Sequence, residues 1–418
     1  MRRYVVLAAG ALAAALVMPV AAAQPAHDTA IGTQVSPRAA AIQPPVFSSA
    51  PRKVTVLTLG TALPDTGSLK AYGPATQAAV RLAVEDANAA GGVLGSPIVL
   101  APQNSGGQGS GIFARTMARL SGAQAIVGPL SSTLVLDNLP AIEGRTLVSP
   151  ATASGLLTGV LARVVPAEPL AGAMLATLAK DRGAVRIVVV GPRDQQPLMD
   201  AALDRARDIG LETSSVVYGK SDSTRGTVSR IVRASADAML LASGAETSDI
   251  LRDLIARGMP ATVLLSPLAA DSVDAGKLRR GTLSGAVTVE VDLRVPRGLE
   301  ARVKALAPRA SKTAYSPQAY DAAAIAILAA EQSGRLLGEI TPEGIRAALP
   351  AVTDIGMPCS TLEQCLRWVQ RGTDIDYVGY GGPFALDSAG DPGKARYLAR
   401  TFTVANQPGS STRPVRYP

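Results

Sequence analysis

Aromatic side chains are scarce in this sequence, because Phe, Trp and Tyr make up only 3% of its 418 residues. Small-molecule sites commonly use such large, rigid side chains as walls, so we expect any pocket to be roomy or loosely packed. Histidine is scarcer still, with His27 as the one example. His27 falls in a stretch that we expect to be an unfolded spacer, so neither a Ser-His pair nor a His-containing metal site can form. We therefore expect no enzyme activity, no metal ion and no cofactor.

Cysteine occurs only twice, at Cys359 and Cys365 in "CSTLEQC". In an oxidising compartment, an even pair this close in sequence usually forms a disulfide, which would contribute on the order of 2 kcal/mol for so small a ring. Two thiols without a nearby His cannot build a zinc site. The pair is therefore predicted to be structural.

Clustered positive charge is also absent, although the formal net charge is +8. The Lys and Arg residues are interspersed with acidic residues and form no block, which argues against nucleic-acid binding.

Residues 1–23 begin with Arg2 and Arg3, continue through an apolar run at 5–18, and end in small residues. This pattern predicts a secretory signal peptide, and the apolar run is too short for a usual membrane span of about 20 residues. No Cys follows it to carry a lipid, so we expect a soluble protein that is periplasmic or secreted.

Short apolar strands alternate with helices over most of the remaining chain. Residues 24–52 are rich in Ala, Pro, Ser and Gln without periodicity and are predicted to be a disordered spacer. From Lys53 the alternation runs through two similar series, and such a pattern predicts an α/β fold with parallel sheets covered on both faces. One helix is especially well marked: it is expected from about Pro74, with Val80, Val84 and Ala87 on one stripe, and to end at Gly91 and Gly92.

Several segments together resemble a known family. They are "LTLGTALPDTGSLKAYGPATQAAVRLAVEDANAAGGVLGSPIVL", "AIVGPLSSTLVL", "LVSPATASGLLT", "YSPQAYDAAAIAILAAEQSG" and "GGPFALDSAGDP". In this order they look like the type I periplasmic solute-binding proteins, in the branched-chain amino acid (Leu/Ile/Val) binding branch of ABC transporters. The similarity covers nearly all of 54–404.

The resemblance implies two Rossmann-like lobes with parallel sheets, joined by a three-segment hinge and closing on a small solute. The expected limits are 53–165 plus about 292–352 for lobe 1, 166–291 plus about 353–405 for lobe 2, and 406–418 for a tail. ABC transporter permease subunits are the implied partners.

Ligands of open α/β sheets bind beyond the carboxyl ends of the strands, and the family's ligand contacts lie at such positions in lobe 1. The resemblance implies these ligand-binding residues: Tyr72, Ser131, Ser132, Ala151, Thr152, Ala153 and Ser154. The serines and Thr152 have an alternative role as helix caps, and Tyr72 has one as a lone Tyr at a turn.

Lobe 2 departs from the family pattern. The family's two aromatic positions and its ammonium-binding acid fall near residues that are neither aromatic nor acidic: Gln195 and Gln196, Gly244 and Ala245, and Pro267 and Leu268. Glu246 and Asp271 are near enough to replace the acid if the alignment is shifted. An ammonium buried without a partner costs several kcal/mol, which favours a carboxylate or amide solute held mainly by lobe 1, or a site that no longer binds.

Two other classes of protein fit parts of the sequence: a dinucleotide-binding enzyme and a secreted ligand sensor or interaction protein. "SGGQGSGI", at 105–112, follows a strand as a dinucleotide-binding loop does, but Ile112 stands where the third Gly of GxGxxG should be. A secreted ligand sensor or interaction protein would keep the fold without transport. The sequence favours the substrate-binding protein of an ABC importer, capturing an amino acid-like, amide or carboxylate solute by lobe closure.

Overall fold

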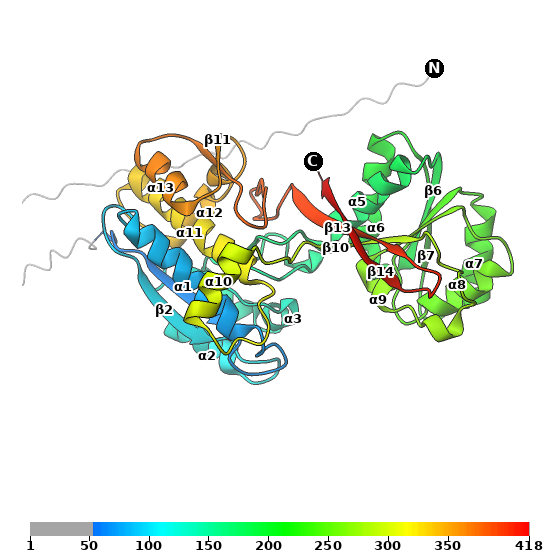
Figure 1. Ribbon diagram of the computed structural model, residues 1–418, viewed down its shortest axis with the longest axis horizontal. Helices are drawn as coiled ribbons and strands as arrows, with labels where there is room; N and C mark the ends of the chain where they lie inside the picture. The colour runs from blue at the N-terminus through cyan, green and yellow to red at the C-terminus, as the bar shows by residue number, and fades with distance from the viewer. Residues whose placement is uncertain (1–52, 418) are drawn as a thin grey trace, which may run out of the picture. The chain divides into compact units, whose positions relative to one another are not determined.

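The computed structural model describes residues 53–417, so the expected signal peptide and spacer lie outside the described residues. Helices and strands alternate along this part of the chain and form two lobes, each built on its own sheet (Figure 1). The predicted α/β class with parallel sheets in two lobes is confirmed. Among the helices in 53–417, none is long and apolar enough to cross a membrane.

The first lobe contains a five-stranded parallel sheet with the order β2-β1-β3-β4-β5. Its strands are β1 (Thr58–Leu63), β2 (Val99–Asn104), β3 (Ala125–Val127), β4 (Leu147–Ser149) and β5 (Ala162–Arg163). One face is covered by α1 (Gly73–Ala89), α10 (Arg297–Leu306), α11 (Ser316–Leu337), α12 (Pro342–Ala348) and α13 (Leu362–Gln370). The other is covered by α2 (Ile112–Arg119), α3 (Ser132–Leu136) and α4 (Leu139–Ile142). Short 3-10 turns at Gly155–Leu157 and Pro350–Val352 and the strand pair β11 (Met357–Cys359) and β12 (Ile375–Tyr377) complete this lobe.

The second lobe contains a seven-stranded sheet with the order β14-β13-β10-β9-β8-β6-β7. Five strands are parallel: β6 (Arg186–Pro192), β7 (Glu212–Tyr218), β8 (Ala238–Leu241), β9 (Thr262–Leu265) and β10 (Val287–Val291). The antiparallel strands β13 (Ala395–Phe402) and β14 (Pro408–Tyr417) extend the sheet beyond β10. Helices α5 (Glu168–Asp181) and α6 (Gln196–Asp208) pack on one face, and α7 (Thr224–Arg233), α8 (Thr247–Ile255) and α9 (Pro267–Asp271) on the other. Short 3-10 turns lie at Arg193–Gln195 and Ala275–Lys277.

The observed packing differs from the expected lobe limits in two places. Residues of 353–386 were expected in the second lobe, but Leu366 and Tyr377 belong to the same apolar core as Leu59 and Val80 of the first. The cause is α13, whose buried side lies against α1 and α11. The expected tail at 406–418 includes β14, which pairs with β13 in the second sheet. The chain passes from the core of one lobe to that of the other in three segments, at 165–170, 292–298 and 387–394.

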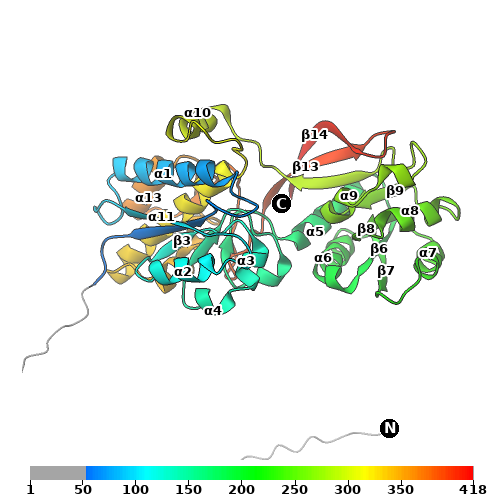
Figure 2. The same ribbon diagram turned by 90° about the horizontal axis from the view of Figure 1, so that it is seen from below.

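Helix α1 is placed as the sequence predicts. It begins with Pro74 in its first turn, and Val80, Val84 and Ala87 are buried against the first sheet and α11 (Figure 2). The chain reverses at Gly92, which has a φ of 72° and donates its N–H to the carbonyl of Ala87 at 2.9 Å. A Cβ at Gly92 would lie 2.0 Å from the Ser96 carbonyl oxygen, so the turn requires glycine.

The two cysteines form the predicted disulfide, with Cα atoms 5.6 Å apart. Cys359 ends β11 and Cys365 lies within α13. The bond therefore ties the small strand pair to the helix that packs on the first lobe.

Candidate functional site

Each sheet has a point at which the chain leaves neighbouring strands toward opposite faces. In the first lobe, β1 leads into α1, which packs in one core, while the adjacent β3 leads into α3, which packs in the core on the other face. In the second lobe, β6 leads into α6 and the adjacent β8 into α8, again on opposite faces. Loops that diverge in this way leave a crevice at the carboxyl edge, which is where open α/β sheets bind ligands. Both lobes have a cavity at this position.

The cavity of the first lobe is small, with a volume of about 70 Å³, and Ser131 lines it together with residues from the loops after β1 and β2. The Ser131 hydroxyl accepts a hydrogen bond from the Leu134 N–H at 3.2 Å and so caps α3. The Ser132 hydroxyl accepts one from the Ser154 N–H at 3.4 Å. The structure thus brings together two of the predicted residues from neighbouring strands and gives Ser131 the capping role.

The backbone of the loop at 151–154 is hydrogen-bonded to the side chain of Ser149, the last residue of β4. The Ser149 hydroxyl accepts hydrogen bonds from the N–H groups of Ala151 at 3.3 Å and Thr152 at 3.0 Å, and donates to the Pro129 carbonyl at 2.7 Å. The Ala153 carbonyl accepts from the Glu168 N–H at 2.7 Å, and the Ser154 hydroxyl accepts from the Leu156 N–H at 3.3 Å. Both contacts fix the course of the loop.

Thr152 differs from the other predicted residues because it is fully buried. Its hydroxyl has no hydrogen-bond partner within the part of the chain that the structure describes. Ala151, Ala153 and Ser154, in contrast, are half-buried. In this loop, solvent therefore reaches Ala151, Ala153 and Ser154 but not Thr152.

Arg163 fixes the same loop from the side and was not among the predicted residues. Its side chain is 0% exposed and donates to the carbonyls of Ser154 at 2.8 Å and Thr152 at 3.3 Å. It also forms an ion pair with Asp391 at 2.6 Å, and the Thr158 hydroxyl donates to the other Asp391 oxygen at 2.6 Å. Arg163 thus ties the candidate loop to the 387–394 segment. The one signal in the sequence is an Arg within the apolar run "LARVV".

Tyr72 packs against other residues and does not line the 70 Å³ cavity. Its ring meets the ring of Tyr315 edge-on, with centroids 5.4 Å apart, and the Lys312 ammonium lies 4.8 Å from its centroid. The Tyr72 hydroxyl also accepts a long hydrogen bond from Lys312 at 3.4 Å. Tyr72 therefore joins the start of α1 to the segment that precedes α11.

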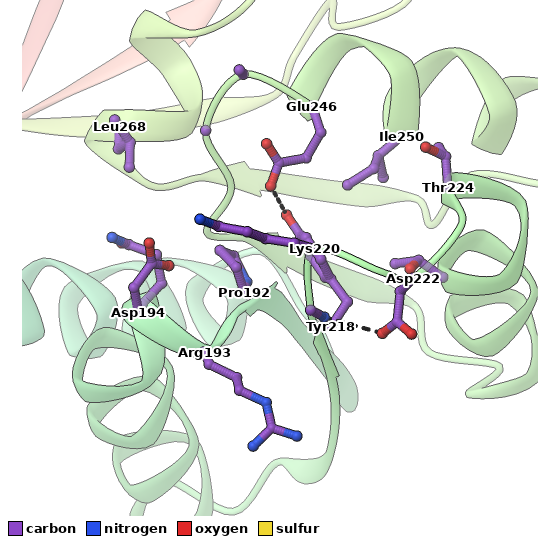
Figure 3. Close-up of a pocket in the computed structure, with 15 residues that line it drawn as sticks. Pro192, Arg193, Asp194, Tyr218, Lys220, Asp222, Thr224, Glu246, Ile250 and Leu268 are labelled. Carbon is purple, nitrogen blue, oxygen red and sulfur yellow. Dashed lines mark hydrogen bonds between the residues drawn. The ribbon is translucent and has the colours of Figure 1, made fainter.

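The cavity of the second lobe is larger, with a volume of about 720 Å³, and lies at the carboxyl ends of β6, β7 and β8 (Figure 3). Four of the positions at which the family pattern fails line it, and Gln196 and Pro267 do not. Its lining residues are Pro192, Arg193, Asp194, Gln195, Tyr218, Gly219, Lys220, Asp222, Thr224, Thr227, Gly244, Ala245, Glu246, Ile250 and Leu268. This cavity contains an aromatic residue, Tyr218, and an acid, Glu246, from neighbouring loops. Asp271, the other acid near the family's position, does not line this cavity.

Tyr218 and Glu246 are hydrogen-bonded to each other. The Tyr218 hydroxyl donates to Glu246 Oε1 at 2.6 Å, and Tyr218 is only 8% exposed. Burial and the contact with the Glu246 carboxylate raise the pKa of Tyr218 well above its usual value, so it remains a neutral donor at physiological pH. Figure 3 shows the second Glu246 oxygen directed away from the tyrosine. The Tyr218 hydroxyl thus fixes the position of the Glu246 carboxylate in this cavity.

Comparisons with known proteins give the fold a family. A family model described as periplasmic binding protein matches residues 56–365. The chemotactic signal transduction system substrate-binding protein BasB of Halobacterium salinarum is 28% identical over 374 residues, covering 84% of this chain and 87% of that protein.

Two solved structures share the fold. A Rhodospirillum rubrum protein thought to belong to a branched-chain amino acid ABC transporter is 21% identical, with a TM-score of 0.58 over 86% of this chain and 100% of that one. An ABC transporter substrate-binding protein from Desulfitobacterium hafniense is 19% identical, with a TM-score of 0.54 over 87% and 100% of the two chains. Because the family model spans well over half of the sequence, the chain belongs to the periplasmic binding protein family.

Proposed function

We propose that this protein is the extracytoplasmic substrate-binding protein of an ABC importer and captures a small amino acid-like, amide or carboxylate solute by closure of its lobes. Membership of the periplasmic binding protein family supports this function, as does the likeness to a substrate-binding protein at 28% identity. The observation that carries the proposal is the meeting of Ser132 and Ser154 at the carboxyl edge of the first sheet, on a loop fixed by Ser149 and Arg163.

The first lobe is suited to a carboxylate or carbonyl oxygen. The Ser132 hydroxyl accepts a hydrogen bond from Ser154, and its own proton is then available to donate to a solute. The loop beside it needs little ordering when the solute binds, because Ser149 and Arg163 already hold its backbone. A site whose donors are held in place before binding loses less entropy on association.

Lobe closure would follow from the difference in solute affinity between the open and closed forms. A solute that binds only the folded protein also raises its melting temperature, by an amount that grows with concentration above the dissociation constant. The closed form would then be recognised by the permease subunits of the transporter.

A thermal-shift screen across amino acids, amides and small carboxylates tests this proposal. Ser132→Ala should weaken binding of the solute by about 1 to 3 kcal/mol if its hydroxyl meets a buried anion. Thr341→Ala is the matched control: it removes the cap of α12, worth about 1 kcal/mol, and should lower stability while leaving the solute-induced shift intact. Equal solute affinity in the wild type and in Ser132→Ala would show that the solute does not bind at Ser132 and would contradict a site in the first lobe.

A second function is favoured by one observation. BasB is named for a chemotactic signal transduction system, so this protein could serve a receptor rather than a permease. Uptake of the labelled solute and taxis toward it, measured in a deletion strain, separate the two functions. Loss of uptake supports import, and loss of taxis with normal uptake supports a ligand sensor.

A further inference from the structure

We propose that a groove on the exposed side of α13 binds a ring-shaped carboxylate, with the ring against the Trp368 indole and the carboxylate at the Arg371 guanidinium. This α13 groove has a volume of about 280 Å³. Its lining residues are Thr361, Glu363, Gln364, Arg367, Trp368 and Arg371. The inference goes beyond the proposed function, because the groove shares no residue with the cavity beside Ser131 or with the loop at 151–154.

Helix α13 ends at the edge of the first sheet that is opposite the proposed solute site. Gln370, in its last turn, donates to the Gly92 carbonyl at 3.3 Å, and the chain from Gly92 leads into the amino end of β2. Ser132 and Ser154 instead follow the carboxyl ends of β3 and β4. A ligand between Trp368 and Arg371 therefore leaves the proposed solute site free.

The helix is held in place before any ligand binds. Its inner side chains belong to the apolar core of the first lobe, namely Leu362, Cys365, Leu366 and Val369. The disulfide between Cys365 and Cys359 also ties the helix to β11. A groove on a fixed helix loses little entropy when a ligand binds, because its walls are already ordered.

Trp368 provides a flat surface for a ring. It is the one Trp of the sequence, and it is half-buried because it packs against the first apolar core while it lines the groove. The hydrogen bonds that α13 side chains form within residues 53–417 do not include its indole N–H. An indole in this setting can stack on a ligand ring and donate its N–H to a ligand oxygen.

Arg371 provides the charge that selects an anion. Its guanidinium is exposed and forms no ion pair within the described part of the chain, whereas Arg367 is paired with Glu363 one turn earlier. Arg371 follows Trp368 by three positions, a spacing that places two side chains of a helix side by side. A guanidinium binds a carboxylate through two parallel hydrogen bonds, so a carboxylate on the stacked ring can meet Arg371.

Polar groups along the groove can bind the rest of the ring. The Thr361 hydroxyl caps α13 by accepting from the Gln364 N–H at 3.3 Å, and the Gln364 side chain is exposed one turn before Trp368. An amide both donates and accepts hydrogen bonds, so it can pair with hydroxyl groups on a ligand. Two kinds of ligand share the required chemistry, an aromatic acid and a sugar acid.

Titrations of the full chain followed by tryptophan fluorescence test the α13 groove, because Trp368 is the one tryptophan in the sequence. The probes are benzoate and glucuronate, compared with neutral benzyl alcohol and glucose and with acetate, which has no ring. We expect at least one of the two acids to give a saturable change at lower concentration than its neutral counterpart and than acetate. The acid that binds more tightly distinguishes an aromatic acid from a sugar acid.

Two variants assign the binding to the groove. Arg371→Gln should weaken the acid about three- to fivefold, the range expected for an exposed ion pair. Arg233→Gln removes an exposed arginine from α7 of the second lobe and should change nothing. Equal curves in the wild type and Arg371→Gln, acetate binding as tight as that of both acids, or no saturable change with either acid would overturn the inference.

Ser132→Ala separates the α13 groove from the proposed solute site. The fluorescence curves should be the same in this variant as in the wild type, even where its solute affinity in the thermal screen is lower. A shift of the curves by Ser132→Ala as large as that by Arg371→Gln would place the acid at the solute site and overturn the inference. Loss of capture at Ser132 with unchanged dependence on Arg371 would leave the groove and contradict only the proposed function.

Discussion

The two lobes have the same winding but hold different chemistry at the crevice that the winding creates. The first lobe has a cavity of about 70 Å³ with hydroxyl and main-chain groups beside it, and the second has about 720 Å³ with Tyr218 and Glu246. The topology accounts for the position of both cavities. Their contents depend on individual side chains at strand ends, which place hydroxyl and main-chain groups in the first lobe and a tyrosine-bound carboxylate in the second.

The largest expected effect comes from removing the buried cation of the first lobe. Arg163→Met would leave Asp391 with the Thr158 hydroxyl as its remaining side-chain partner and would release the loop at 152–154, so we expect the free energy of unfolding to fall by about 3 to 5 kcal/mol. Denaturant unfolding measures it. Arg207→Met, which breaks an exposed pair with Asp204, should cost less than about 1 kcal/mol. Equal losses in the two variants would show that the buried ion pair of Arg163 contributes no more to stability than an exposed pair does.

The disulfide is expected to matter less, and only for the first lobe. Replacing both Cys359 and Cys365 with Ala should lower the free energy of unfolding by about 2 kcal/mol, because the unfolded chain regains the entropy of the closed ring. Solute binding should be unchanged at a temperature where the variant stays folded, because the bond lies outside the 151–154 loop. A variant that loses this binding while folded would show that the loop depends on the disulfide.

The lobes also differ in the number of hydrogen bonds that an acid withdrawn from solvent accepts. Asp321 in α11 is fully buried and accepts hydrogen bonds from the Tyr377 hydroxyl and from the N–H groups of Tyr380 and Gly381, whereas Glu246 accepts one. Burial nevertheless raises the pKa of Asp321 to about 6. The folded protein therefore binds this proton more tightly than the unfolded chain does. The stability that protonated Asp321 contributes is fully present below about pH 4 and is lost as the pH rises through about 6.

Asp321→Asn tests this dependence. The wild type should lose on the order of 1 to 2 kcal/mol more stability than the variant between about pH 4 and 6. Denaturant unfolding at several pH values measures the difference. Identical slopes in both proteins would mean that Asp321 titrates alike in the folded and unfolded chains.

The smallest expected effect distinguishes two buried threonines, one in each lobe. The hydroxyls of Thr152 and Thr288 both lack a hydrogen-bond partner within 53–417, and both side chains are buried. We expect Thr152→Val to weaken solute binding by about 1 kcal/mol, as the hydroxyl gains a partner when the loop adjusts to the solute. Thr288→Val should leave solute binding unchanged. Calorimetric titration compares them, and equal affinities would exclude Thr152 from solute binding.

Local patterns were the predictable part of this fold. Helix α1, its turn at Gly91 and Gly92, and the pairing of Cys359 with Cys365 depend on residues close in sequence. The packing of α13 on the first lobe was missed because helix periodicity shows which side is apolar but not which sheet covers it.

The candidate sites were less predictable because they join distant segments. Arg163 and Asp391 are 228 positions apart, and no local pattern relates them. Tyr218 ends β7, while the family pattern directed attention to the loops after β6, β8 and β9. Glu246 matches the family's acid only if the alignment is shifted, and its hydrogen bond joins it to Tyr218, 28 positions away in the sequence.

Small-angle X-ray scattering with and without a solute found in the thermal screen tests the central claim most directly. The account predicts that saturating solute lowers the radius of gyration of the wild type, and that Ser132→Ala needs a several-fold higher concentration for the same change. A solute that binds the wild type tightly and leaves its radius of gyration unchanged would contradict capture by closure of the lobes.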